Sequence, residues 1–201
     1  MLPTKLDEET SLVGAKIPAG VRVAVIGSTS FWHDESQETC ADIGERLAAF
    51  DNLVLVTGGV CGVGECIGRG FVKGCRKLGL TPSVIHVLPR GCGAWDYGTT
   101  LFAGDSMGER REILGRLAKA FIVVEGGPGT EHEATVAAAH GAVLVPVGRS
   151  GGHAGALYPG LLRPPFVDSR TWETLGDPEA APRIVAKAVM EIVESYVRHG
   201  V

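Results

Sequence analysis

Short apolar segments alternate with longer amphipathic segments along most of the chain. The apolar segments are rich in Val, Ile and Leu and too short for helices, so each is typical of a buried strand. They predict strands at residues 22–27, 53–56, 83–88, 121–124 and 143–147. The segments between them repeat their apolar residues with helical spacing. They predict helices over residues 34–50, 63–78, 106–119, 131–140 and 182–196.

This alternation predicts a single α/β domain. Its fold class is a Rossmann-like, doubly wound parallel sheet with helices on both faces and right-handed crossovers. A chain of 201 residues is long enough to bury the core of one such domain. We expect the domain to span residues 21–201 and to follow an N-terminal extension, residues 1–20, that is loosely held.

Local signals refine two of the predicted helices. Asp34 and Gln37 have the spacing of a capping box at the start of the first helix. The second helix carries Gly64, Gly68, Gly70 and Gly74. Because glycine costs about 1 kcal/mol relative to alanine inside a helix, this helix is expected to pack very closely against a neighbour.

Several connections between these elements are long. Residues 89–105 form a glycine-containing connection, which is typical either of a binding loop or of a surface excursion. Residues 148–155 are a second glycine-rich segment that follows a strand. Residues 156–177 are interrupted by prolines, and we expect short helical turns there, near 157–162 and 171–175.

A candidate anion site lies where the strand at 121–124 ends. Gly126, Gly127 and Gly129 allow close approach of the backbone, and Thr130 is placed to cap the helix that begins at Glu131. Free N–H groups and the positive end of the helix dipole then meet at one point, which suits a nucleotide phosphate. An ordinary turn between a strand and a helix is the alternative.

The predicted topology brings other strand ends to the same place. Ligands of doubly wound sheets bind beyond the carboxyl ends of the strands, where the strand order reverses. In the common order this point lies between the first and fourth strands, so Gly27 and Ser28 should face Gly127 across one crevice. Gly58 and Gly59 end the second strand and are expected to form the side wall.

One arginine lies on the apolar face of the predicted helix at 106–119. Arg110 projects among apolar residues of that face, which are Met107, Ile113, Leu114, Leu117 and Ala118. A buried guanidinium needs a carboxylate, a phosphate or a wet cleft, because it does not lose its proton. Glu133 is the candidate partner. The alternatives are an arginine that reaches solvent and an ion pair that serves packing alone.

Composition and charge add mainly exclusions. The formal net charge of −4 gives no basic surface for nucleic acid, and no segment has the length and apolarity of a membrane span. The first residues do not resemble a signal peptide, so we expect a cytoplasmic protein. The cysteines show neither paired nor ligand-like spacing, which favours reduced thiols over disulfides or a zinc site. We therefore expect no metal and no cofactor.

The segments Met107-Gly108-Glu109-Arg110-Arg111 and Glu125-Gly126-Gly127-Pro128-Gly129-Thr130-Glu131-His132-Glu133 resemble motifs of the LONELY GUY-type phosphoribohydrolases, once labelled lysine decarboxylases. The family pattern is Met-His-x-Arg-Lys followed by Pro-Gly-Gly-x-Gly-Thr-x-x-Glu, with the same spacing between its arginine and its glutamate. The segment Leu55-Val56-Thr57-Gly58-Gly59 is also similar, and the resemblance spans about residues 21–148.

The resemblance implies hydrolysis of a nucleoside 5′-monophosphate to free base and ribose 5-phosphate. Arg110 and Glu133 would be the catalytic pair. Residues that would bind the substrate are Gly27, Ser28, Gly58, Gly59, Met107, Arg111, Gly126, Gly127, Gly129 and Thr130. A homodimer with the third and fourth predicted helices near its interface is also implied.

The chain departs from the family pattern at Gly108, Arg111, Glu125 and His132. Glu125 matters most, because a carboxylate beside a phosphate site repels the phosphate unless it points away. The segment 59–65 is similar to a sister branch that includes molybdenum cofactor carrier proteins, which hold a phosphorylated pterin without cleaving it. Such a carrier is the alternative function.

Two other chemistries have weaker support in the sequence. A nicotinamide-dependent oxidoreductase would need a different glycine fingerprint and an acidic residue after the third strand, where Pro89 and Arg90 stand. Nucleophilic catalysis by Ser28 or Cys61 lacks a histidine that the sequence places as a base. His132 fits a surface or packing residue better than a ligand-facing base.

Overall fold

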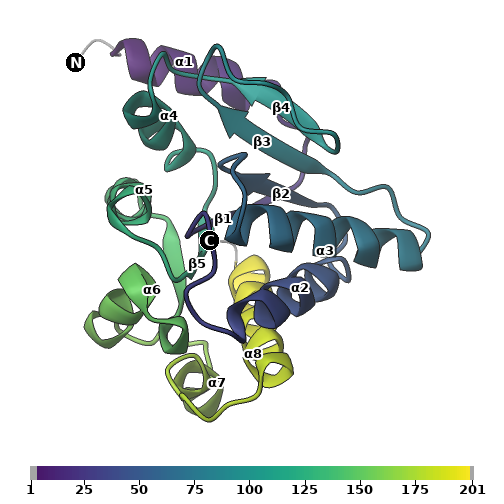
Figure 1. Ribbon diagram of the computed structural model, residues 1–201, viewed down its shortest axis with the longest axis vertical. Coiled ribbons are helices and arrows are strands. Elements are labelled where there is room, and N and C mark those ends of the chain that lie inside the picture. Colours follow the sequence, from purple (N-terminus) through teal and green to yellow (C-terminus); the bar gives the residue numbers. More distant parts are fainter. Residues whose placement is uncertain (1–3, 200–201) are drawn as a thin grey trace.

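The computed structural model describes residues 4–199 as one α/β unit built on a parallel sheet (Figure 1). The strand order is β4-β3-β2-β1-β5-β6, and each neighbouring pair is parallel. The strands are β1 (Val21–Gly27), β2 (Leu53–Thr57), β3 (Val84–Leu88), β4 (Thr99–Phe102), β5 (Ala120–Val124) and β6 (Val143–Val147). The predicted fold class and the five predicted strands are confirmed.

Helices cover both faces of this sheet (Figure 1). Apolar residues of α2, α3, α7 and α8 form the core on one face, and those of α1, α4, α5 and α6 form the core on the other. The helices are α1 (Lys5–Gly14), α2 (Ser36–Leu47), α3 (Val63–Lys77), α4 (Met107–Leu114), α5 (Pro128–Ala139), α6 (Gly152–Leu157), α7 (Ser169–Thr174) and α8 (Pro182–His199), with short 3-10 turns η1 (Gly148–Ser150) and η2 (Tyr158–Gly160).

Helices α2 and α3 pack with their backbones in contact. A Cβ on Gly70 would lie 2.6 Å from the carbonyl oxygen of Ala41, and one on Gly74 would lie 2.6 Å from that of Glu45. Those distances are shorter than a carbon and an oxygen tolerate, so only glycine fits at either position. The predicted close packing of the glycine-rich helix is confirmed.

Strand β4 was not predicted. It lies within the 89–105 connection and pairs with β3 at the edge of the sheet, with its end residues Thr99 and Phe102 exposed. Edge strands bury one face at most, so the short Thr-Thr-Leu-Phe segment lacks the continuous apolar run of the inner strands. The segment forms a strand because it pairs with β3, and the local sequence does not signal that pairing.

The expectation of a loosely held segment before residue 21 is wrong for the part that the structure describes. Helix α1 begins with a capping box between Thr4 and Asp7, and it buries Val13. The Glu9 carboxylate accepts a hydrogen bond from the Gly104 N–H at 2.8 Å and pairs with Arg90. These partners lie far along the chain, so the local pattern did not reveal them. Residues 1–3 lie outside the described residues.

Several helix ends also differ from prediction. The cap of α2 is Glu35, without a side-chain bond, so the expected Asp34 capping box is absent. Helix α4 ends at Leu114 instead of residue 119. Helix α5 begins at Pro128 with Gly127 as its cap, which places Thr130 inside the first turn. Proline suits that first position because it has no N–H to leave unpaired.

The last third of the chain contains two further differences. The helix at 152–157 was not expected, whereas η2 forms within the expected turn near 157–162 and α7 covers much of the expected turn near 171–175. In α8, Ile184 was expected on the buried face, but it is 46% exposed. Its neighbours Val185 and Ala186 are fully buried, so Ile184 lies outside the buried face of α8.

Candidate functional site

The candidate site lies at the carboxyl ends of β1 and β5. These strands are direct neighbours, with Gly27 paired to Val124, and the chain leaves them in opposite directions along the sheet. A cavity of about 240 Å³ opens there. Ser28 and Gly127 both line it, as the topology predicted. The lining residues are Gly27, Ser28, Thr29, Trp32, Val60, Met107, Arg110, Arg111, Gly127, Pro128, Gly129, Thr130 and Glu133.

Arg110 and Glu133 form a buried ion pair on the wall of this cavity. Nη1 of Arg110 donates to Oε1 of Glu133, and the two residues are 2% and 6% exposed. The predicted partnership is confirmed. In residues 4–199, Nε of Arg110 is buried without a hydrogen-bond partner. Nε of Arg116 and Nε of Arg149, which lie away from this cavity, are buried without a partner in the same way.

Burial and charge act in opposite directions on Glu133. Its enclosure raises the pKa of the Glu133 carboxyl above the ordinary value, and the nearby guanidinium of Arg110 opposes that rise. Arg110 keeps its proton at any physiological pH. The permanent positive charge of Arg110 therefore stabilises the charged form of the Glu133 carboxylate, which burial alone would disfavour.

Met107 sits at the edge of the same cavity, one turn before Arg110. Its sulfur lies 3.9 Å from Nη2 of Arg110, and the residue is 37% exposed. Met107 therefore lies at the exposed amino end of the apolar face of α4, where it lines the cavity. An exposed apolar side chain beside the ion pair is free to contact a ligand.

Gly58 and Gly59 support the site from behind and do not line the cavity. A Cβ on Gly58 would lie 2.7 Å from Nη1 of Arg110, so the guanidinium rests on this backbone. Gly59 has a positive φ of 59°, and its carbonyl accepts a hydrogen bond from Nε1 of Trp95 at 2.8 Å. The expected side wall is therefore a backing surface for Arg110.

The amino end of α5 presents free donors to the cavity. Its first backbone bond runs from the Glu131 N–H to the Gly127 carbonyl at 3.0 Å. The N–H groups of Gly129 and Thr130 precede it and have no partner within the helix, while Pro128 has none to offer. Together with the helix dipole, these groups form a place for an anion.

Arg111 adds a positive charge to this helix end. A Cβ on Gly129 would lie 2.7 Å from Nη2 of Arg111, so the guanidinium lies directly over the first turn. Arg111 forms no ion pair with any residue between 4 and 199. A cation without a carboxylate partner, next to free N–H groups, is the arrangement that phosphate-binding sites use.

Gly126 shapes the turn without lining the cavity. Its φ is 94°, and a Cβ there would lie 2.4 Å from Oγ1 of Thr130. Thr130 is 4% exposed and fills the space beneath the turn. Gly126 thus keeps its place because of backbone conformation and a close contact, and contact with a ligand is not required to explain it.

The Glu125 side chain points away from the α5 donors. Its carboxylate accepts hydrogen bonds from the Ser28 hydroxyl at 2.5 Å and from the His33 N–H at 3.0 Å, and it is fully buried. It is not among the residues that line the cavity. Because the Glu125 carboxylate points away from the α5 donors, it does not repel a phosphate bound there as the motif suggested.

Of the other residues that depart from the family pattern, Arg111 lines the cavity, whereas Gly108 and His132 lie outside it. His132 faces α4, where its Nε2 lies 2.7 Å from Oε1 of Glu112. This contact agrees with the expectation of a surface residue. Gly108 lies in the first turn of α4, with Ser106 Oγ at 3.7 Å from a Cβ placed on it. Neither residue contributes a wall of the site.

The two long glycine-containing segments hold the site in place. Within 89–105, the indole of Trp95 bonds Gly59, which adjoins the backbone under Arg110. Within 148–155, the N–H of His153 donates to the Gly126 carbonyl at 2.7 Å. Sequence reasoning left the role of both segments open, because these contacts depend on tertiary neighbours.

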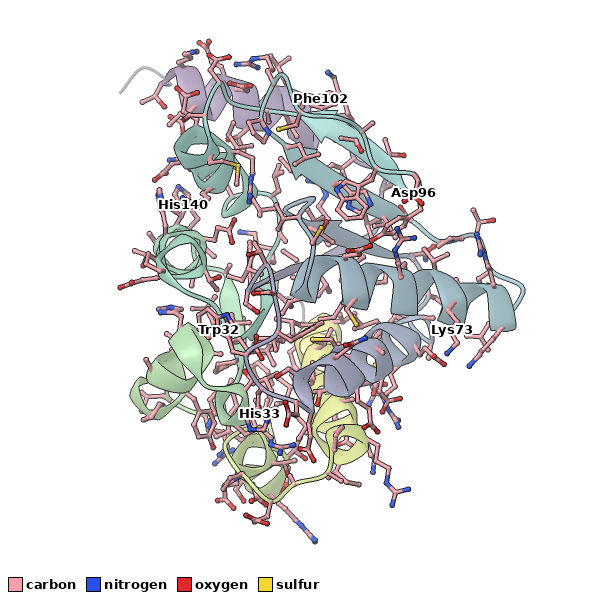
Figure 2. All side chains as sticks on the ribbon, in the orientation of Figure 1. Trp32, His33, Lys73, Asp96, Phe102 and His140 are labelled. Carbon is pink, nitrogen blue, oxygen red and sulfur yellow. The ribbon has the colours of Figure 1, made fainter. Side chains whose placement is uncertain are left out.

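Sequence reasoning missed three residues that line the cavity, namely Trp32, Val60 and Pro128. Trp32 is 57% exposed and is drawn between α5 and α6 in Figure 2. Its position after the first predicted strand was the available signal. Its orientation toward the cavity depends on the bonds between its loop and Glu125.

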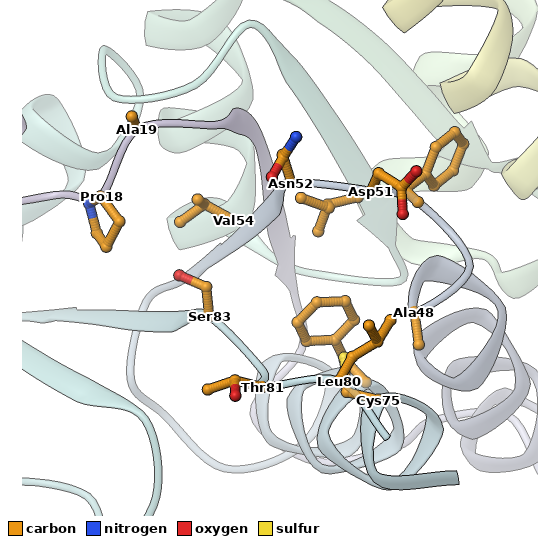
Figure 3. A pocket seen from close by; sticks show the side chains of 13 residues that line it. Pro18, Ala19, Ala48, Asp51, Asn52, Val54, Cys75, Leu80, Thr81 and Ser83 are labelled. Carbon is orange, nitrogen blue, oxygen red and sulfur yellow. The ribbon is translucent and has the colours of Figure 1, made fainter. Parts of the chain in front are cut away.

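A second cavity of about 410 Å³ lies at the opposite end of the strands, near the amino ends of β2 and β3 (Figure 3). It adjoins residues that precede β2 and β3, including Asn52 and Ser83. Asp51 is the only charged residue that lines it. It therefore lacks the cations and helix donors that make the first cavity suitable for a phosphate.

In residues 4–199, no three His, Cys, Asp or Glu side chains come together as metal ligands would. No helix in the same range is long and apolar enough to cross a bilayer.

Several solved structures share the fold of this chain. The protein TM1055 matches with a TM-score of 0.61 and 22% identity, over 76% of this chain and 88% of that one. The molybdenum cofactor carrier protein of Chlamydomonas reinhardtii matches with a TM-score of 0.53 and 21% identity, over 63% and 75%. At these identities the likeness establishes the fold alone.

A third structure bears on the expected partners. DNA processing protein A from Helicobacter pylori, whose structure concerns single-stranded DNA binding, matches with a TM-score of 0.54 and 16% identity, over 82% of this chain and 83% of that one. The expectation that nucleic acid is not a partner therefore gains no support and stays a prediction.

A comparison with curated proteins finds no match. A family model, however, matches residues 20–157, which include the whole candidate site. The match begins just before β1 and ends with α6. On this evidence the chain belongs to the SLOG cluster4 family.

Proposed function

We propose that the protein is a phosphoribohydrolase that cleaves the N-glycosidic bond of a nucleoside 5′-monophosphate, as the LONELY GUY-type enzymes do. The observation that carries this proposal is the buried Arg110–Glu133 pair beside the free amino end of α5. The match to the SLOG cluster4 family covers the whole site but does not choose the reaction.

The phosphate of the substrate would bind at the α5 amino end. The N–H groups of Gly129 and Thr130 donate to it, and Arg111 supplies the positive charge above them. Gly27 and Gly127 form the adjoining walls. This leaves the ribose next to the Arg110–Glu133 pair, because the two sites share one small cavity.

The pair would then act on the glycosidic bond. Positive charge develops on the sugar as the base departs, and the Glu133 carboxylate stabilises that charge and orients the attacking water. Arg110 holds the carboxylate in place through the buried ion pair. Water adds to the sugar carbon, its proton passes to the leaving base, and the products are free base and ribose 5-phosphate.

The test is release of free base from adenosine monophosphate and its N6-prenylated analogue, followed by chromatography. Glu133→Gln and Arg110→Lys should each lower the turnover number at least about 100-fold, the usual scale for a proton-transfer or charge-stabilising group. His132→Ala is the matched control, because His132 lies on the same helix and faces Glu112.

A molybdenum cofactor carrier is the second candidate. It is favoured by the structural match to the carrier protein of Chlamydomonas reinhardtii. A carrier would use Arg111 and the α5 amino end for the phosphate of the pterin, and it would not need Glu133 as a reacting group. Tight binding of a phosphorylated pterin, without base release from any nucleoside monophosphate, would support the carrier and refute the hydrolase.

Assembly and location belong to the same proposal. We expect a homodimer with α4 and α5 near the interface, which light scattering of the purified protein would test. A cytoplasmic location is expected because a phosphoribohydrolase or a pterin carrier meets its ligand there. We expect neither nucleic acid nor a membrane as a partner, and neither a cofactor nor a metal.

A further inference from the structure

Hydrogen-bond donors from one short segment converge on the Glu125 carboxylate. The Ser28 hydroxyl donates to Oε2 at 2.5 Å, and the N–H groups of Trp32 and His33 donate at 3.1 Å and 3.0 Å. All of them follow β1 directly. The carboxylate is fully buried, and it forms no ion pair with any residue from 4 to 199. Its negative charge is therefore balanced by hydrogen bonds alone.

The backbone of Glu125 is held in an unusual conformation. Its φ is 52°, in the region that non-glycine residues rarely adopt. Its N–H donates to Ser150 Oγ at 2.8 Å, and its carbonyl accepts from the Ala154 N–H at 3.0 Å. The surrounding segments thus maintain a strained conformation, and that conformation aims the side chain at the segment after β1.

The donor set around Glu125 has the form of an anion site. A hydroxyl and consecutive backbone N–H groups at the end of a strand are the groups that bind phosphates in many parallel-sheet proteins. Ser28 and Trp32 also line the cavity, so this donor set adjoins the space that a ligand would enter. It lies beside the α5 amino end, because only Gly126 separates Glu125 from the cap of that helix.

We propose that Glu125 is an internal anion that fills a second anion position of the cleft, leaving the α5 amino end as the position for a single phosphate group of the ligand. The inference rests on the proposed function, in which a phosphate binds at α5. The Ser28 proton is committed to Glu125, so it is not available to the ligand. A second phosphate group would find no free donor there and would meet a negative charge.

The wild-type protein gives the first test, with inorganic phosphate and pyrophosphate as calorimetric probes. Pyrophosphate carries more negative charge, so a simple cationic cleft would bind it more tightly. The filled second position predicts the reverse, with pyrophosphate at least about 10-fold weaker, which corresponds to roughly 1.4 kcal/mol. Equal or tighter binding of pyrophosphate would overturn the inference.

Glu125→Gly gives the second test. Glycine suits a φ of 52°, so this change removes the carboxylate while easing the backbone strain. We expect the variant to bind two phosphate ions per chain where the wild type binds one, and to bind pyrophosphate at least as tightly as phosphate. Formate, which matches the missing carboxylate, should raise the melting temperature of this variant and not that of the wild type.

Glu125→Gln is the matched control, because its amide fills the same space. It should keep one phosphate per chain. A single phosphate per chain in Glu125→Gly, with no effect of formate, would refute the internal-anion role. Phosphate and pyrophosphate contain no glycosidic bond, so these binding measurements decide the role of Glu125 independently of hydrolysis. Failure of base release would refute the hydrolase proposal alone.

Discussion

The guanidinium of Arg111 lies directly over the backbone of Gly129, where a single added methyl group would meet it at 2.7 Å. One residue belongs to α4 and the other to the first turn of α5, so this contact joins the two helices at the candidate phosphate position. The absence of a side chain at Gly129 is what lets the cation approach the helix donors. The contact therefore links a sequence feature to ligand affinity.

Gly129→Ala separates binding from folding. The clash is with the mobile end of Arg111, and alanine favours a helix over glycine by up to about 1 kcal/mol, so stability should be unchanged or slightly higher. Binding of ribose 5-phosphate should weaken about 10-fold, because the guanidinium is pushed away from the helix end. Calorimetry with thermal melting measures both. Gly160→Ala, where a Cβ meets nothing within 4 Å, is the control.

Removing one partner of the Arg110–Glu133 pair should lower stability strongly, whereas replacing both partners with apolar residues should lower it little. Glu133→Ala leaves a buried, unpaired guanidinium and should lower the free energy of unfolding by about 3–5 kcal/mol. The double variant Arg110→Met, Glu133→Leu removes both charges and should recover most of that loss, yet show no base release. Denaturant titrations measure the stabilities. A stable double variant with wild-type turnover would show that the pair serves packing alone.

At acidic pH, the turnover rate should follow the protonation of the Glu133 carboxylate. Its pKa is raised above 4.5 by burial, so the carboxylate takes up a proton at a higher pH than an exposed glutamate does. Turnover requires the charged form, so the rate should fall as pH decreases through a midpoint above 4.5. Inhibition by ribose 5-phosphate, measured over the same pH range, shows how much of the fall comes from titration of the substrate phosphate instead of Glu133. A rate that is constant down to pH 4.5 would contradict this assignment.

The glycines between α2 and α3 should be critical for folding and irrelevant to the chemistry. Gly74→Val would place side-chain atoms against the backbone of Glu45, where even a Cβ lies at 2.6 Å. We expect a loss of at least about 3 kcal/mol in the free energy of unfolding, on the scale of severe overpacking. Gly108→Val, at a helical glycine where a Cβ would meet only Ser106 Oγ at 3.7 Å, reports the cost of valine in a helix without such a clash.

Much of the fold followed from the sequence because its signals are local. Apolar runs such as Phe121–Val124 are buried on both sides of the sheet, so period and length identify them. The pairing of Arg110 with Glu133 was also predictable, since a charge on an apolar helix face requires a partner. These features depend on the residues of one element and its immediate successor.

The features that sequence reasoning missed depend on distant partners. Strand β4 is defined by its pairing with β3, and α1 by its contacts with the segment that contains Gly104. The direction of the Glu125 side chain depends on a positive φ and on donors almost a hundred residues away, at Ser28. No local pattern encodes such contacts, so the motif suggested repulsion where the structure has an internal hydrogen-bonded anion.

The most direct measurement is chromatography of free base from adenosine monophosphate incubated with the wild type and with Glu133→Gln, alongside His132→Ala. The proposal predicts base and ribose 5-phosphate in equal amounts from the wild type and from His132→Ala. It predicts at least about 100-fold slower release from Glu133→Gln. Release that is equal in all three proteins, or absent from the wild type with every nucleoside monophosphate, would contradict it.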